Sequence, residues 1–364
     1  MSRHTRAIIN LSHIKANYNM ANQWAPKSKN MAIIKADAYG HGLVTVARAL
    51  ESVVPAFGVA IFDEAVELRS AGIKNNILIL QGISFVEELI YASENDLWIT
   101  IHNKKQLDLL LSNLQEKAIN IWLKFDTGMH RLGFSESDLL NALDKIKKCA
   151  WVKNDIVISS HFSCASELNN KENSRQLELF VRTLSVLNKN NNIQFSLANS
   201  PAIVNLPSAS FDWNRPGLML YGLPLFDVAH ESDDRLVPAM TFESKIIGLR
   251  SVSKGEFVGY GKKWWAERES KIATVEVGYA DGYPRQAKNG TPILVNGQRA
   301  KLAGVVSMDL ISVDVTDIVN VCVGDLVELW GENLCANEVA SYADTIGYDL
   351  ISGVSQRVPR NYRN

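Results

Sequence analysis

The sequence predicts a (β/α)₈ barrel over residues 1–237, followed by a mostly-β domain over residues 238–364. Three observations predict this architecture. At roughly 150 residues per domain, 364 residues suffice for two domains. Short apolar runs alternate with longer amphipathic stretches from Met31 to about Gly222, which is typical of strands and helices around a parallel sheet. After an acidic, polar segment at residues 227–238, the pattern becomes that of antiparallel strands.

Eight apolar runs are expected to form the strands of the barrel. In a closed ring of eight strand–helix units, the catalytic loops follow the C-terminal ends of the strands. Several runs end in polar or glycine-rich clusters, such as KADAYGHG and KFDTGMHRLG, which favours a closed barrel over an open, doubly wound sheet. The runs are residues 32–34, 57–61, 77–80, 97–101, 119–125, 156–160, 195–197 and 218–221.

The second domain carries a clear hairpin signal. Asn296 and Gly297 stand between two apolar-rich runs, which indicates a two-residue type I′ turn. Residues 321–331, VCVGDLVELWG, are expected to contain another strand. Only residues 336–350 have helical spacing in this half, so one short helix is expected. In the first domain, the asparagine-rich segment at 188–192 is expected to be a loop.

Composition argues against several classes of partner and site. The 38 Lys and Arg residues balance 39 Asp and Glu residues, which argues against nucleic acid or an anionic membrane surface as a partner. No apolar run reaches the roughly 18 residues of a membrane span, and the N-terminus lacks an apolar signal core, so a cytoplasmic location is expected. The four cysteines lack CxxC spacing, and the seven histidines lack the paired spacing of metal ligands, so no metal site is expected.

Residues 32–42, AIIKADAYGHG, are the strongest candidate for chemistry. A buried-looking strand delivers Lys35 at its C-terminal end, and a tight glycine-rich loop with Tyr39 and His41 follows. Desolvation can lower the pKa of a lysine from about 10.4 towards the range in which its neutral amine attacks a carbonyl, as a Schiff base requires. Taken alone, such a segment more often carries an exposed lysine at a strand end. Both interpretations stay open on these residues alone.

Nine segments, in this order, resemble the pyridoxal-phosphate-dependent alanine racemase family over nearly the whole chain. They are AIIKADAYGHG, LKFDTGMHRLGF, SHFS, ANSPA, NRPGLMLYG, VGYG, VGYADGYPR, SMD and RVPR. The family's fold, a barrel followed by a β-rich domain, agrees with the prediction from apolar patterning. The resemblance implies an enzyme that interconverts L- and D-alanine with pyridoxal 5′-phosphate (PLP), acting as a homodimer with sites shared between subunits.

The resemblance assigns the acid/base residues. It implies that Lys35 forms the Schiff base with PLP and serves one face of the substrate Cα. Racemisation needs a second acid/base on the opposite face, which the family places on the tyrosine of VGYG, here Tyr260 of the partner subunit, with His161 beside it. Arg215 is expected to face the pyridine nitrogen. A guanidinium can donate but cannot accept a proton, which implies an unprotonated pyridine and a weaker electron sink.

The resemblance also assigns residues to the substrate and the phosphate. Arg131 and the backbone N–H of Met308 are expected to bind the substrate carboxylate, since the planar fork of arginine donates two parallel hydrogen bonds. Lys124 aligns with a lysine that is carbamylated in many family members, and an ordinary strand-end lysine is the alternative. The residues expected at the phosphate are Tyr39, Asn199, Ser200, Gly217 and Leu218.

The entrance is expected on the second domain. Tyr279 and Asp309 match residues that line it, and Arg285 matches a more distant entry position; a solvated polar surface is the alternative for all three. Gln356, in VSQRVPR, departs from the family. Many racemases have a tyrosine there that contacts the phosphate and narrows the entrance, whereas glutamine is smaller and less rigid. That contact is therefore not carried over to this chain.

Three other functions remain open from the sequence. They are a racemase for serine or another amino acid, a barrel-type amino-acid decarboxylase, and a non-catalytic PLP carrier. A decarboxylase would not need the VGYG tyrosine, Tyr260. A carrier lacks the β domain that residues 238–364 are expected to form.

Overall fold

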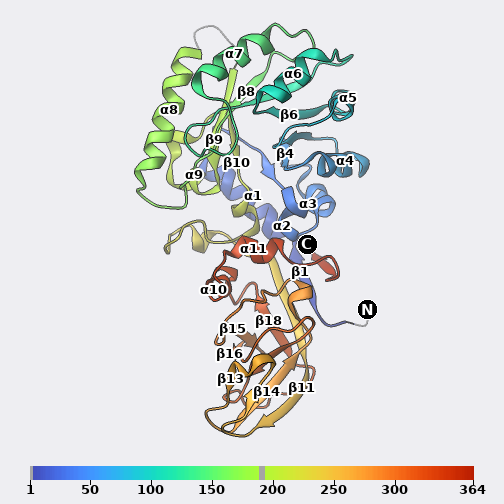
Figure 1. Ribbon diagram of the computed structural model, residues 1–364, viewed down its shortest axis with the longest axis vertical. Helices are drawn as coiled ribbons and strands as arrows, with labels where there is room; N and C mark the ends of the chain where they lie inside the picture. Colours follow the sequence, from blue (N-terminus) through green and yellow to red (C-terminus); the bar gives the residue numbers. More distant parts are fainter. Residues whose placement is uncertain (1–2, 188–192) are drawn as a thin grey trace.

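The computed structural model describes residues 3–187 and 193–364, which form a parallel barrel followed by a β-rich domain (Figure 1). The loop expected at 188–192 lies outside the described residues. The strands of the first sheet are β2 (Lys29–Asn30), β3 (Ala32–Ile33), β4 (Ala56–Val59), β5 (Asn76–Ile79), β6 (Leu97–Ile101), β7 (Asn120–Lys124), β8 (Ile156–Ser159), β9 (Ile193–Asn199) and β10 (Trp213–Arg215).

One interrupted strand closes this sheet into a barrel. The hydrogen-bonded order is β2-β10-β9-β8-β7-β6-β5-β4-β3, and only Met31 separates β2 from β3. Across the closure, the Met31 N–H donates to the Asn214 carbonyl at 2.9 Å and the Ile33 N–H donates to the Pro216 carbonyl at 2.9 Å. With β2 and β3 counted as one strand, eight parallel strands form the ring, so the predicted (β/α)₈ barrel is confirmed.

The expected strand at residues 218–221 is wrong. These residues form a 3₁₀ helix, η2 (Leu218–Tyr221), and the last barrel strand is β10, ending at Arg215. Pro216 has no N–H to donate to a neighbouring strand, which explains why the strand stops there. A short apolar run does not by itself distinguish a buried helix from a strand.

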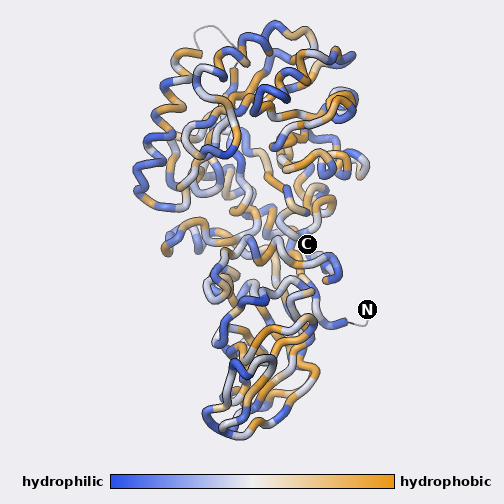
Figure 2. The backbone as a smooth tube through the Cα atoms, in the orientation of Figure 1, coloured by the Kyte–Doolittle hydropathy of each residue, from blue (hydrophilic) through white to orange (hydrophobic). Residues whose placement is uncertain are grey.

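Helices alternate with the strands, and along them hydrophobic and hydrophilic residues alternate (Figure 2). In the third helix, for example, Leu43, Val46, Ala47 and Leu50 are buried, at the spacing of one helical face. The helices of this domain are α1 (Leu11–Trp24), α2 (Lys35–Gly40), α3 (Leu43–Leu50), α4 (Phe62–Ser70), α5 (Val86–Glu94), α6 (Lys104–Ser112), α7 (Glu136–Lys147), α8 (Lys171–Leu187), α9 (Ser200–Asn205), η1 (Pro207–Ala209), η2 and η3 (Asp233–Arg235).

Tryptophan side chains fill the barrel interior. The rings of Trp98 on β6, Trp122 on β7 and Trp213 on β10 have centroids 5.5 to 6.2 Å apart. Because β6 and β10 are not neighbours in the sheet, the contact between Trp98 and Trp213 crosses the interior. A packed interior is typical of an eight-stranded barrel and leaves the C-terminal ends of the strands as the place for a site.

The second sheet has eight strands in the order β14-β17-β16-β15-β18-β11-β1-β19. One of these strands, β1, comes from the N-terminal segment that precedes the barrel. It pairs antiparallel with β11 and parallel with β19. A separate ribbon of β12 and β13 lies beside the sheet. The elements are β1 (Arg6–Asn10), β11 (Met240–Val252), β12 (Phe257–Val258), η4 (Tyr260–Lys262), β13 (Trp264–Trp265), β14 (Ser270–Val275), η5 (Tyr279–Asp281), β15 (Pro292–Val295), β16 (Gln298–Leu302), β17 (Ile311–Asp314), β18 (Leu326–Trp330) and β19 (Arg360–Arg363).

The expected hairpin is confirmed, whereas the expected single helix is wrong. Asn296 and Gly297 have φ of 49° and 78° between β15 and β16, as a type I′ turn requires. The late helical stretch forms two short helices, α10 (Ala336–Ser341) and α11 (Gly347–Ser352), which lie between the barrel and the second sheet (Figure 1). None of the helices within residues 3–187 and 193–364 combines the length and apolar character that crossing a membrane requires.

Candidate functional site

Lys35 begins a turn of unusual handedness at the end of the first barrel strand. Residues 36–39 of α2 have φ between 52° and 54°, so this segment is a left-handed helical turn. Residues other than glycine pay roughly 1–2 kcal/mol each for that conformation. The sequence predicted a glycine-rich loop here, and the left-handed turn was missed because its residues are alanine, aspartate and tyrosine.

Glu64, which the sequence analysis missed, ties this turn to the neighbouring strand. One oxygen of its carboxylate accepts the Ala36 N–H at 2.6 Å, and the other accepts the Ala60 N–H at 2.7 Å, just beyond β4. Glu64 lies near the start of α4, where a glutamate commonly reaches back to the preceding backbone, and this position was the available signal. The contact fixes the backbone next to Lys35.

Aromatic rings and the second domain hold the other end of the turn. The Tyr39 and His41 rings both pack against Tyr221, with centroids 4.7 and 4.6 Å from its ring. At Gly40 a Cβ atom would lie 2.2 Å from the Ile351 carbonyl of α11, so glycine is required for this close approach. Burial raises the pKa of Tyr39, which keeps its phenol protonated and able to donate.

A cavity of about 1410 Å³ opens at the C-terminal ends of the barrel strands, where the predicted barrel residues meet. Residues of the segment around α10 and α11, including Tyr348, form part of its wall; the sequence analysis did not identify Tyr348. The predicted residues that line the cavity are Lys35, Tyr39, Lys124, Arg131, His161, Asn199, Ser200, Arg215, Gly217 and Leu218.

Arg215 is a buried cation in this cavity. Its guanidinium, 6% exposed, donates to the Ser160 carbonyl at 2.5 Å, to the Leu197 carbonyl at 3.2 Å and to the Ser196 hydroxyl. No carboxylate within residues 3–187 and 193–364 pairs with it. Burial lowers the pKa of Arg215 to about 10, so it stays protonated at neutral pH. Ser196 gave no signal, because it is one serine within an apolar strand.

The other basic groups lower one another's pKa values. Burial, and then the charge of Arg131, lowers the pKa of Lys35, with Glu64 opposing. Burial, followed by Arg215 and Arg131, holds the pKa of Lys124 well below its ordinary value. Burial, followed by the charges of Lys124 and Arg215, holds the pKa of His161 well below its ordinary value, so its imidazole is neutral at pH 7. Such crowding of basic groups suits an anionic ligand.

The cradle at one end of the cavity consists of hydroxyl groups and backbone. The Ser200 hydroxyl oxygen accepts the N–H groups of Gly217 at 2.9 Å and Met219 at 3.2 Å. With both lone pairs of that oxygen engaged, the hydroxyl proton is left to donate to a ligand. A Cβ atom at position 217 would lie 2.9 Å from the Tyr39 hydroxyl oxygen, so glycine keeps this space open. Asn199 instead caps α9, since its side-chain oxygen accepts the Ala202 N–H at 3.3 Å.

Arg131 lies on the loop between β7 and α7, which Asp126 shapes. One oxygen of Asp126 accepts the N–H groups of Gly128 at 2.9 Å and His130 at 3.0 Å, and the other contacts the His130 ring at 3.0 Å. Burial raises the pKa of Asp126, but these hydrogen bonds outweigh it and the pKa is lowered. In the described part of the chain no ion pair engages Arg131, so its guanidinium can receive a carboxylate.

The second-domain residues do not join this cavity. Tyr260 is 71% exposed in η4, and Met308 is 53% exposed. The Arg285 guanidinium lies 6.0 Å from the centre of the Tyr279 ring. None of the predicted second-domain residues lines the described cavity; these are Tyr260, Tyr279, Arg285, Met308, Asp309 and Gln356.

The fold and the cavity together define a barrel protein whose crowded basic side chains, beside a lysine of lowered pKa, suit a small anionic ligand. The chain belongs to the alanine racemase family. The family's N-terminal domain, described as "Alanine racemase, N-terminal domain", matches residues 9–224, and "Alanine racemase, C-terminal domain" matches residues 239–362. The family resemblance drawn from the sequence motifs is thereby confirmed.

Individual relatives match over the whole chain. The chain is 46% identical to the alanine racemase of Alteromonas mediterranea over 360 residues, which cover 99% of both proteins. It is 44% identical to the catabolic alanine racemase of Pseudomonas putida, again over 99% of both. The solved biosynthetic alanine racemase of Pseudomonas aeruginosa is similar with a TM-score of 0.95 and 42% identity, covering 100% of each chain. The solved alanine racemase of Bartonella henselae with covalently bound pyridoxal phosphate is similar with a TM-score of 0.89 and 28% identity, covering 99% of each chain.

Proposed function

We propose that this chain interconverts L- and D-alanine with PLP as its cofactor. The observation that carries the proposal is the placement of Lys35, with its lowered pKa, in one cavity with a hydroxyl cradle and Arg215. The alanine racemases of Alteromonas mediterranea and Pseudomonas putida match over 99% of this chain, which supports alanine as the substrate.

The groups that line the cavity fit PLP. The Ser200 proton, the Tyr39 phenol and the Leu218 N–H suit a phosphate, in the space that the missing side chain of Gly217 leaves open. Asn199 holds the helix that begins at Ser200. Arg215 suits the pyridine nitrogen as a donor. When bound, PLP would supply an aldehyde that reacts with amines and an electron-withdrawing ring that would acidify the substrate Cα–H.

Two proton carriers on opposite faces perform the racemisation in this proposal. A planar carbon that lost its proton from one face changes configuration only if a proton returns to the other face. Burial and the charge of Arg131 lower the pKa of Lys35, so its Nζ releases a proton more readily than the amine of an ordinary lysine, as an acid/base group requires. The opposite face belongs to the Tyr260 hydroxyl of the partner subunit, with His161 near it.

Substrate binding uses donors from both domains. Arg131, which lacks an ion-pair partner among the described residues, receives the substrate carboxylate together with the N–H of Met308 of the partner subunit. Lys124 is proposed to carry a carbamate: its neutral amine attacks CO₂ and releases one proton. The resulting anion would attract Arg131 and Arg215, whose charges lower the pKa of the unmodified Lys124.

We infer a homodimer, which the positions of the second-domain residues support. Tyr260, Met308, Tyr279, Asp309 and Arg285 are proposed to complete the cavity of a second copy, since none of them lines the described cavity of its own chain. The high exposure of Tyr260 supports this arrangement.

We place the domain boundary within residues 227–238, between the two family matches, with β1 joining the second sheet. Four free cysteines support a reducing, cytoplasmic location.

The residue at position 356 bears on the range of amino acids that the site accepts. Gln356 is exposed on the second domain and stands where many racemases have a tyrosine, which supports a wider entrance and activity on serine or other amino acids as a second candidate function. Neither a decarboxylase nor a PLP carrier has a use for the opposite-face tyrosine.

One experiment tests the proposal. The purified protein is incubated with PLP, its visible absorbance is recorded, and the loss of optical activity is followed with L-alanine, L-serine and larger L-amino acids. The proposal expects a coloured protein and fastest turnover of alanine. A colourless protein without turnover after addition of PLP would refute it.

A further inference from the structure

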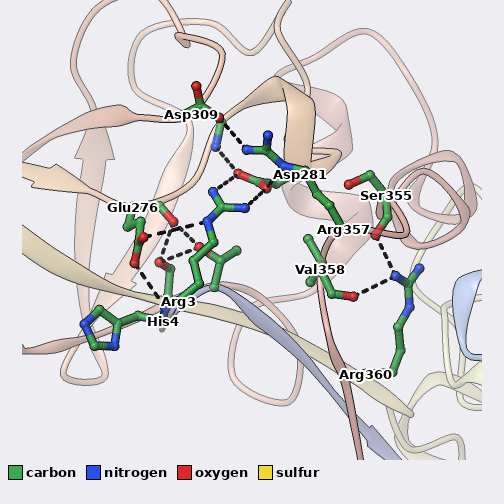
Figure 3. Close-up of polar contacts among 12 residues, drawn as sticks. Arg3, His4, Glu276, Asp281, Asp309, Ser355, Arg357, Val358 and Arg360 are labelled. Atoms are coloured by element: carbon green, nitrogen blue, oxygen red, sulfur yellow. Dashed lines mark hydrogen bonds and ion pairs between the residues drawn. The ribbon is translucent and has the colours of Figure 1, made fainter. Parts of the chain in front are cut away.

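Five charged side chains form a chain of ion pairs in and beside the second domain, in the order Glu276, Arg3, Asp281, Arg357 and Asp309 (Figure 3). Asp281, fully buried at the end of η5, accepts two hydrogen bonds from the Arg3 guanidinium, at 2.5 and 2.8 Å. Arg357 donates to the same carboxylate through Nε at 2.7 Å and to Asp309 through a terminal nitrogen at 2.5 Å. Arg3 Nε also lies 3.7 Å from a carboxylate oxygen of Glu276, so two cations alternate with three carboxylates.

Asp281 joins three segments that are far apart in the sequence. Its side chain accepts the Gly278 N–H at 2.9 Å, which closes its own loop. Its carbonyl accepts the Ser355 N–H at 3.1 Å, from the segment before Gln356. Arg3 adds the N-terminal segment (Figure 3). A buried carboxylate is costly unless paired, so these contacts depend on one another. Burial raises the pKa of Asp281, but the bonds from Arg3 and Arg357 outweigh it and the pKa is lowered.

The loop of Asp281 is in turn joined to the loop that carries Met308. The Tyr279 N–H donates to the Ser307 carbonyl at 3.0 Å, and the Ala280 N–H donates to the Met308 carbonyl at 3.0 Å. At Gly278 a Cβ atom would lie 2.3 Å from the Met308 carbonyl oxygen, so the two backbones are in close contact. The Met308 N–H has no acceptor within residues 3–187 and 193–364, which leaves it free for a ligand.

Among the residues that the structure describes, Arg357 is the one whose side chain connects the two loops. The planar Arg357 guanidinium pairs with Asp281 in one loop and with Asp309 in the other, whereas the single ammonium of a lysine could pair closely with only one of them. Asp309 directly follows Met308, so the pairing with Arg357 restrains the residue whose N–H is free.

We propose that Arg357 is a positioning residue which, by pairing with Asp281 and Asp309 at once, fixes the Met308 N–H for the substrate carboxylate. This inference rests on the proposed function. It identifies a residue that acts on substrate binding without lining the cavity of its own chain or touching the cofactor.

The test uses the PLP-loaded dimer of Arg357→Lys. Arg268→Lys is the matched control, since Arg268 donates to Asp317 at 2.5 Å on the exposed surface of the same domain. In Arg357→Lys we expect KM for L-alanine to rise about tenfold with kcat nearly unchanged, because one charged hydrogen bond is lost. The dissociation constant of propionate, an alanine analogue without the amino group, should rise equally. Hydrogen exchange in residues 278–282 and 307–310 should accelerate, while PLP affinity and dimer mass stay as in the control.

Each outcome decides the inference. Unchanged KM, propionate affinity and hydrogen exchange in a folded Arg357→Lys dimer would overturn it, as would an equal loss of PLP affinity, which would indicate a general structural role. If Arg357→Lys does not fold, Asp309→Asn removes only the outer ion pair and should raise the propionate dissociation constant about threefold. A wild-type protein that binds PLP and propionate but racemises no amino acid would refute the proposed function, while propionate affinity would still test the role of Arg357.

Discussion

A terminal nitrogen of Arg215 lies 3.3 Å from Nδ1 of His161, where the last barrel strand approaches the end of β8. A guanidinium has only donors, so Nδ1 must accept and the imidazole proton belongs on Nε2. Burial, Lys124 and Arg215 hold the pKa of His161 well below its ordinary value. His161 is thus fixed as a neutral group in one tautomer, and Arg215 fixes it.

Arg215→Lys should lower kcat by roughly two orders of magnitude. A lysine ammonium cannot reach the Ser160 carbonyl, the Ser196 hydroxyl and His161 together, so the His161 tautomer is released and the donor proposed for the pyridine nitrogen is lost. Steady-state kinetics with L-alanine measure the effect. Arg182→Lys, at an exposed pair with Glu136, is the control. A kcat within threefold of wild type would contradict the assignment.

Arg131→Lys should lower kcat/KM by about two orders of magnitude while PLP stays bound. The loop shaped by Asp126 remains intact, but a lysine offers one point of charge where a carboxylate needs two parallel donors. The measurement pairs kcat/KM for L-alanine with the visible absorbance of bound PLP. Normal turnover by the variant would refute the carboxylate role.

Features set by local chemistry could be predicted from the sequence. The barrel strands follow from apolar runs, and the turn at Asn296 and Gly297 follows from residues that accept positive φ. The barrel site could be located because the ends of parallel strands meet at one mouth. The short apolar run at Leu218–Tyr221 was misassigned because it satisfies both helix and strand patterns.

Features set by distant contacts could not be predicted. The left-handed turn after Lys35 depends on Glu64 and on the close approach of Gly40 to Ile351, more than 300 residues away. Strand β1 finds its partners in β11 and β19, although it precedes the first barrel helix. Local propensity carries no information on such pairings.

Ser200→Ala should raise the PLP dissociation constant about tenfold, since it removes one hydrogen-bond donor to the phosphate and leaves the Gly217 and Met219 N–H groups without their acceptor. Titration of the apoprotein, followed by absorbance, measures this constant. Pyridoxal, which lacks the phosphate, serves as the control ligand, and its affinity should change much less. Equal losses for both ligands would show that Ser200 does not act on the phosphate.

His41 predicts a pH dependence of stability. Burial, partly opposed by its hydrogen bond to the Tyr39 carbonyl, lowers the pKa of His41 to about 4. The unfolded chain, with a pKa near 6.5, therefore binds a proton that the folded chain does not. The contribution of His41 to the free energy of unfolding is fully present above pH 6.5. It declines as the pH falls towards 4, by about 3 kcal/mol in total.

The variant His41→Phe isolates the contribution of His41 titration to stability, because phenylalanine keeps the packing against Tyr221 and cannot titrate. Urea unfolding between pH 4 and 8 should show the stability of wild type falling relative to the variant below pH 6.5, with a constant difference above pH 7. A constant difference over the whole range would mean that His41 is solvated or paired in the folded protein.

Mixing two inactive variants tests whether sites are shared between subunits. Lys35→Ala and Tyr260→Phe each remove one proton carrier. If Tyr260 serves the partner's site, a mixed dimer has one site with both carriers and one site with neither. Random pairing makes half of the dimers mixed, so about a quarter of wild-type activity should return after coexpression. Lys35→Ala mixed with the double variant Lys35→Ala/Tyr260→Phe must stay inactive, because no chain in that mixture carries the lysine. No recovery in the first mixture, with mixed dimers verified by differently tagged chains, would place both carriers on one chain.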